Sequence, residues 1–145
     1  MNIPKASATL QQIIDFYTKS TAFVRLAGST QKDYDTHLDA VCKTVVEGKA
    51  LGTYRNKTIK VRHLTQAYEQ WLTVGVRTAN YRKSVLSAAW KHSMRHDVMT
   101  HDPVSLVKIK SSQPRRVLWS RDQVRTFLET SYDDFRWRSI GLIVH

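Results

Sequence analysis

The sequence predicts an all-α protein, with four helices in the first 110 residues followed by a linker and one or two further helices. Apolar residues recur in several segments at the i, i+3, i+4 and i+7 spacing of one helix face, and no segment alternates as a strand does. Residues that favour helix ends flank these segments. A chain of 145 residues, 41% of them hydrophobic, can bury a core without disulfides or metals.

The first two helices are predicted from their caps and their apolar stripes. Thr9 can cap the first helix. The apolar face of this helix comprises Leu10, Ile13, Ile14 and Tyr17. After a loop over residues 19–28, a second helix is expected to start at Ser29 or Thr30 and to continue to about Glu47, before Gly48. Its inner stripe is Tyr34, Leu38, Val41, Cys42 and Val45.

A basic segment, residues 49–62, separates the second helix from the third and is expected to be a loop or a short extended ribbon. Thr65 is the predicted cap of the third helix, and Gly75 ends it. The inward residues of this helix are Leu64, Tyr68, Trp71 and Leu72.

The fourth helix is the longest, from Arg77 or Thr78 to about Asp97. Asp102-Pro103 closes this region, because a residue before proline avoids the helical conformation. Residues 108–116 have the composition of a linker. The apolar face of a further helix, which starts at Ser120, is Val124, Phe127 and Leu128, and a last apolar stretch covers residues 140–144. We therefore expect a helical domain over residues 1–110, and over 111–145 a linker with the truncated start of a second domain.

Positive charge is concentrated in one third of the chain. The net charge is +11 at neutral pH with a pI near 10.0. Residues 49–96 hold ten lysines and arginines against one acid, Glu69, whereas residues 1–48 are balanced. A polyanionic partner explains this distribution, because the charge would otherwise only repel itself. The single cysteine, Cys42, excludes an internal disulfide, and neither a signal peptide nor a long apolar span is apparent, so we expect a cytoplasmic protein.

The polar face of the fourth helix is the strongest candidate for contact with nucleic acid. It carries cations and short hydrogen-bonding side chains without a carboxylate, as a helix in the major groove of duplex DNA requires. The candidate residues on this helix are Arg77, Asn80, Lys83, Ser84, Ser87, Lys91 and Arg95. Lysine and arginine would bind phosphates, and Asn80 is predicted to read base edges. A solvated basic surface is the alternative interpretation.

Two further groups of residues are candidates for phosphate contact. In the basic segment these are Arg55, Lys57, Lys60 and Arg62, unless that segment is a mobile loop. Thr30, with Lys32 nearby, marks a helix start whose free backbone N–H groups could bind a phosphate.

Enzymatic sites are not indicated. His92 and His96 have i, i+4 spacing, but no glutamate lies between them and no cysteine or carboxylate cluster completes a metal site. We expect surface or groove-facing histidines, no metal and no cofactor. No glycine-rich phosphate loop, nucleophile elbow or catalytic carboxylate pair is present.

The order of these features resembles the N-terminal part of phage-type integrases, the tyrosine recombinase family. The matching motifs are Thr30 with Tyr34 and Leu38, Leu64-Thr65 with Tyr68 and Leu72, Thr78-Ala79-Asn80-Tyr81 leading to Trp90, and Asp102-Pro103 with Val104. Residues 115–127 resemble the family's linker and the start of its catalytic domain, and residues 138–144 resemble the helix that leads to its first catalytic arginine.

The resemblance implies that residues 1–110 form a SAM-like, four-helix core-binding domain that grips double-stranded DNA at a recombination site in the bacterial nucleoid, with other copies of the recombinase as possible partners. It implies no catalytic residue in this chain, because none of its six tyrosines matches the family's nucleophile motif. Two alternatives stay open: a free-standing nucleic-acid-binding accessory or regulatory protein without an enzymatic domain, and a protein-interaction module for an acidic partner.

Overall fold

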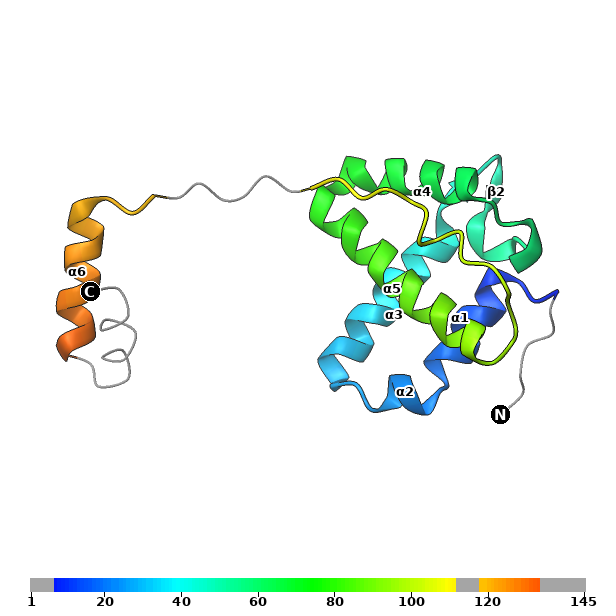
Figure 1. The fold of residues 1–145 in the computed structure, drawn as a ribbon, viewed down its shortest axis with the longest axis horizontal. Coiled ribbons are helices and arrows are strands. Elements are labelled where there is room, and N and C mark those ends of the chain that lie inside the picture. Colours follow the sequence, from blue (N-terminus) through cyan, green and yellow to red (C-terminus); the bar gives the residue numbers. More distant parts are fainter. Residues whose placement is uncertain (1–6, 112–117, 134–145) are drawn as a thin grey trace. The chain divides into compact units, whose positions relative to one another are not determined.

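A computed structural model describes residues 7–111 and 118–133 of the chain (Figure 1). The chain divides into two compact units, Met1–Ser112 and Gln113–His145. Apart from one short hairpin, the regular elements in the described residues are helices, which confirms the predicted all-α class. None of these helices is long and apolar enough to cross a membrane, and no group of three or more potential metal ligands occurs in the same part of the chain.

Helix α1 (Leu10–Thr18) begins as predicted, at a reciprocal cap. The Thr9 hydroxyl accepts the Gln12 backbone N–H at 3.3 Å, and the Gln12 side chain accepts the Thr9 N–H at 3.0 Å. All four predicted apolar residues of this helix are buried. The loop expected over residues 19–28 instead contains a short helix, α2 (Thr21–Val24), because Ser20 caps the backbone N–H of Phe23.

Helix α3 (Gly28–Lys43) starts before Ser29 and Thr30 and ends four residues earlier than predicted. Strands β1 (Val45–Val46) and β2 (Lys49–Ala50) pair antiparallel immediately after it. Glu47 and Gly48 form the turn with φ of 50° and 78°, the positive values that a two-residue hairpin turn requires. The prediction that Val45 belongs to the core is therefore wrong: Val45 is 54% exposed, whereas Val46 is buried.

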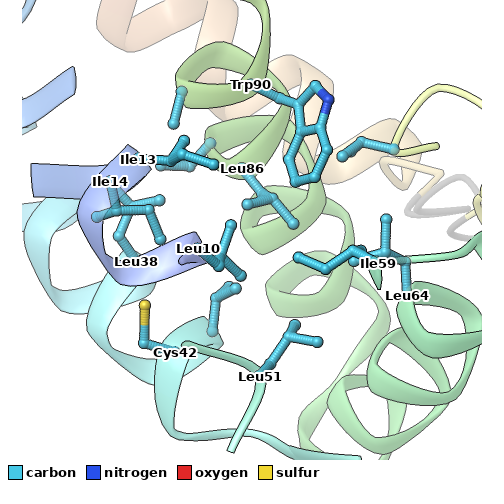
Figure 2. Packing of buried hydrophobic residues seen from close by; sticks show 14 of the residues in the cluster. Leu10, Ile13, Ile14, Leu38, Cys42, Leu51, Ile59, Leu64, Leu86 and Trp90 are labelled. Atoms are coloured by element: carbon cyan, nitrogen blue, oxygen red, sulfur yellow. The ribbon is translucent and has the colours of Figure 1, made fainter. Parts of the chain in front are cut away.

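The basic segment is anchored by residues that face inward. After β2 it forms two 3₁₀ turns, η1 (Leu51–Thr53) and η2 (Asn56–Thr58). The fully buried residues Leu51 and Ile59 secure its two ends (Figure 2). Asn56 is buried as well and donates its side-chain amide to the Val98 carbonyl at 3.4 Å. The expected loop or extended ribbon is therefore a packed connection, whose lysine, arginine and threonine side chains face solvent.

Helix α4 (Val61–Val74) begins before the predicted cap, Thr65. His63 accepts the Lys60 backbone N–H at 3.1 Å and so caps the helix from within, while the Thr65 hydroxyl donates to the Val61 carbonyl one turn back. Gly75 ends the helix as predicted, at a φ of 150° that favours glycine. This single residue connects α4 to helix α5 (Val76–Arg95).

Helix α5 lies at the centre of the first unit and packs against α1, α3 and α4 (Figure 1). Leu86 and Trp90 face the α1 residue Ile13 in the core (Figure 2), and Trp90 donates its indole N–H to the His101 carbonyl at 2.9 Å. Trp71, which the sequence predicts to face inward, is almost fully buried, and so is Trp90.

The chain turns after α5 at Asp102-Pro103, as predicted. The Asp102 carboxylate accepts the backbone N–H groups of Val104 and Ser105 and so forms the turn. Val104 and Val107 are buried beyond it, and residues 108–111 form an exposed segment without regular secondary structure.

In the second unit the structure describes helix α6 (Arg121–Asp133) and the residues just before it. Ser120 and Gln123 cap each other reciprocally, which confirms the predicted helix start. The Phe127 ring packs edge-on against Trp119 with ring centroids 5.2 Å apart. The predicted apolar stretch over residues 140–144 lies outside the described residues.

Candidate nucleic-acid interface

The two faces of α5 have the environments that its sequence predicts. The buried residues of this helix are Ala79, Val85, Leu86, Ala89, Trp90, His92 and Ser93. Arg77, Ser84, Lys91 and Arg95 are exposed on the helix, and Asn80, Lys83 and Ser87 are partly exposed. One helix therefore contributes both to the core and to a polar surface without acids.

Six of the seven candidate residues of α5 line one groove of about 530 Å³. They are Asn80, Lys83, Ser84, Ser87, Lys91 and Arg95, whereas Arg77 lies outside the lining. The rest of the lining comes from Ala88 and His92 of α5 itself, Tyr17 of α1, Ala22 of α2 and Ile109 of the segment after α5. The groove therefore combines residues from both ends of the first unit with the polar face of its central helix.

The charge of this groove is positive. Lys83, Lys91 and Arg95 contribute cations, and none of the lining residues is an acid. Ser84 and Ser87 lie between the cations and can donate or accept hydrogen bonds. A concave surface of one charge sign focuses its electrostatic field, so this groove attracts an anion more strongly than isolated surface lysines would.

His92 forms part of the groove and is only 7% exposed. Its ring lies against Phe16 and Tyr17 of α1, with centroid distances of 5.2 and 5.5 Å, and 4.7 Å from the ring of His96. Burial, with smaller effects from His96 and Arg95, holds the His92 pKa below its usual value of 6.5. Its surroundings therefore favour the neutral ring, and its buried Nε2 has no hydrogen-bond partner.

The Asn80 side chain is already engaged by other residues of the protein. Its Oδ1 accepts the Tyr68 hydroxyl at 2.5 Å, and its Nδ2 donates to the Lys110 carbonyl at 2.9 Å. The Tyr68 oxygen in turn accepts the Lys110 backbone N–H at 2.8 Å. Asn80 therefore lies on the polar face of α5, as predicted, and lines the groove, but its amide is oriented by partners within the chain.

The basic residues of segment 49–62 do not join this groove. Arg55, Lys57, Lys60 and Arg62 are all exposed, and none of them is among its lining residues. Lys57 and Lys60 border a separate hollow of about 300 Å³. Arg62 lies 3.5 Å from the Glu47 carboxylate, so the hairpin turn partly neutralises this end of the segment.

Thr30 and Lys32 are also separate from the groove. Thr30 lies within the first turn of α3 because the helix begins at Gly28, with Ala27 as a cap that makes no side-chain hydrogen bond. Lys32, two residues further on, is exposed. The structure thus gathers the α5 candidates and leaves the other two groups apart.

The groove also contains residues that the sequence did not single out for binding. Ala22, Ile109 and Tyr17 are distant from α5 in sequence, and no local pattern marks them as neighbours of its polar face. The sequence predicts that His92 and His96 are surface or groove-facing histidines, and only the packing against α1 shows that His92 is a buried part of this surface.

Comparison with solved structures identifies the fold. Over 88% of this chain, the structure superposes on a lambda integrase dimer bound to a COC′ core site, with a TM-score of 0.67 and 17% identity. For a lambda integrase tetramer bound to a Holliday junction the coverage is 89%, the TM-score 0.68 and the identity 17%. The chain shares the fold of the matching part of these integrases.

A third structure with this integrase fold is the Tn1549 transposon integrase in complex with a circular intermediate DNA, matched over 93% of this chain with a TM-score of 0.63 and 17% identity. The chain spans 35%, 37% and 42% of the three integrase chains. No family model matches the sequence, and no curated protein matches it. The resemblance to tyrosine recombinases predicted from the sequence is confirmed in the fold.

Proposed function

We propose that this chain is the DNA-binding portion of a phage-type site-specific recombinase, and that the α5 groove grips duplex DNA at the recombination site. The observation that carries the proposal is the convergence of three cations and two serines in one acid-free groove. Lys91 and Arg95 are one helical turn apart and suit successive phosphate contacts, because phosphate binding needs charge more than exact direction.

The comparisons support the proposal through what the similar proteins bind. The integrases that share the fold were solved with a core site, a Holliday junction and a circular intermediate DNA. Two of them are a dimer and a tetramer, so other copies of the recombinase are proposed partners as well. The protein would then act at bacterial DNA, inside the cell.

Within the proposal, the first unit binds DNA and performs no chemistry. Several of its tyrosines take part in the packing of the fold: Tyr17 and Tyr68 are buried, and the Tyr54 hydroxyl donates a hydrogen bond to the Val46 carbonyl. The pKa of Tyr17 is raised by burial and by Tyr34, and that of Tyr81 by burial, Tyr34 and Asp33. A raised pKa makes a phenol harder to activate as a nucleophile, and we assign no catalytic residue here.

A salt titration with labelled duplex DNA tests the proposal. Each neutralised phosphate contributes a slope of about −0.9 to log K against log salt, so Lys91→Ala and Arg95→Ala should each weaken binding to every sequence and reduce the slope by about 1. Lys43→Ala is the matched control, because it removes one exposed charge from α3, outside the groove. Affinity that stays constant between roughly 50 and 200 mM salt would contradict DNA binding through the groove.

A further inference from the structure

Three hydrogen bonds close a ring around the backbone of Lys110. The Lys110 N–H donates to the Tyr68 oxygen at 2.8 Å, the Tyr68 hydroxyl donates to Asn80 Oδ1 at 2.5 Å, and Asn80 Nδ2 donates to the Lys110 carbonyl at 2.9 Å. Both backbone polar groups of one residue are thus held by side chains from two helices, α4 and α5.

The chemistry of the ring permits only one arrangement of its protons. A tyrosine hydroxyl has one proton, and since its oxygen accepts the Lys110 N–H, that proton points to Asn80. The amide oxygen of Asn80 must then face Tyr68, which leaves the amide nitrogen to donate to the Lys110 carbonyl. Tyr68 is only 3% exposed, so its oxygen is aligned by the core around it.

The ring joins two parts of the molecule that line the groove, α5 and the segment after it. Asn80 lines the groove on α5, and Ile109, the residue before Lys110, lines it from the segment after α5. Ile109 is 58% exposed and so has little apolar packing to keep it in place.

We propose that Tyr68 and Asn80 are positioning residues of the DNA-binding groove: by holding the backbone of Lys110, they fix the neighbouring Ile109 as part of one of its walls. The proposal rests on the proposed function, and it gives Asn80 a positioning role in place of base reading. Because Asn80 is shared by ring and groove, DNA bound in the groove should in turn stabilise the ring, as thermodynamic linkage requires.

Hydrogen exchange of the Lys110 amide, measured on the full chain with and without duplex DNA, tests the ring directly. In Tyr68→Phe the free chain should exchange this amide about fivefold faster or more, the equivalent of one lost hydrogen bond. Tyr54→Phe is the matched control, since it removes a hydroxyl that donates to Val46 elsewhere in the unit. An unchanged exchange rate at Lys110 in Tyr68→Phe overturns the proposal.

DNA affinity tests the positioning role. Tyr68→Phe and Asn80→Ala should each weaken DNA binding several-fold, and the double variant should lose little more than either, because both break one ring. Additive losses, or an Asn80→Ala variant that changes sequence preference while Tyr68→Phe does not, overturn positioning in favour of base reading. Should Tyr68→Phe fail to fold, Lys110→Pro removes the N–H donor, with Lys110→Ala as the control for the lost charge.

Failure of the proposed function and failure of the positioning role give different results. Exchange at Lys110 in the DNA-free chain depends on the ring alone, whereas binding by the unaltered chain depends on the proposed function. An unaltered chain that does not bind duplex DNA overturns the proposed function and the positioning role with it. Normal binding by a Tyr68→Phe chain with accelerated Lys110 exchange overturns the positioning role alone.

Discussion

Helices α5 and α6 have similar amphipathic patterns and very different surroundings. In α5 the apolar face packs against α1, α3 and α4, and Trp90 is fully buried. In α6 the apolar residues Val124, Phe127 and Leu128 are only partly buried, and Leu118 just before the helix is 91% exposed. An apolar hollow of about 550 Å³ lies beside Trp119 and Phe127. The comparison shows that periodicity identifies the face a helix can bury but not what will cover it.

The largest expected difference between the two helices is in stability. Trp90→Ala should lower the free energy of unfolding by about 3–5 kcal/mol, because it leaves a cavity among close-packed residues. Phe127→Ala should cost less, about 1–2 kcal/mol, because the ring is only partly buried and contacts the exposed Trp119. Urea denaturation followed by circular dichroism measures both. Equal losses would mean that the α6 face is buried in solution.

A smaller difference is expected in the response to acid. The folded state lowers the pKa of His92 through burial, His96 and Arg95, and that of His37 through burial and Arg82, which outweigh Asp33. Below a pH of about 6.5 the unfolded chain therefore binds more protons, and the free energy of unfolding decreases as pH falls from about 7 to 5.

The substitution His92→Gln should flatten this pH dependence, because it removes one of the two groups. Urea unfolding at several pH values checks the result, and α6 serves as an internal reference because its described residues contain no histidine. A pH dependence identical to that of the unaltered chain would exclude His92 as a source.

The smallest expected effect concerns Cys42. Burial, together with Asp15 and Asp39, raises the pKa of its thiol to about 12, so the reactive thiolate is scarce and covered. A thiol reagent should modify Cys42 only as fast as the first unit opens. Deleting residues 113–145 should leave this labelling rate unchanged, and a large increase would show that the second unit protects the first.

The sequence predicts much of the fold because many of its signals are local. The capping pair of Thr9 and Gln12, the end of α4 at Gly75 and the Asp102 turn each depend on residues a few positions apart. The hairpin after α3 was missed because Val45 fits a helical stripe as well as a strand. Similarly, Thr65 is a good cap by type, but His63 makes the capping contact.

The candidate site was predictable in composition and not in shape. The helical periodicity of the sequence correctly separates the core face of α5 from the face that carries Lys91 and Arg95. This periodicity does not indicate that Tyr17, Ala22 and Ile109 also line the groove, because tertiary packing brings them there. The engagement of Asn80 depends on Lys110, thirty residues away, and no local pattern encodes that distance.

The single-residue connection at Gly75 has a consequence for the order in which the molecule assembles. Helices α4 and α5 pack against each other with almost no loop to close, so their contacts carry a small entropic cost. Contacts between α1 (Leu10–Thr18) and α5 (Val76–Arg95) join residues far apart in the sequence and cost more. Substitutions such as Leu64→Ala should therefore mainly slow refolding, whereas Ile13→Ala should mainly accelerate unfolding. The helical pair would then form the nucleus on which the N-terminal helices complete the groove.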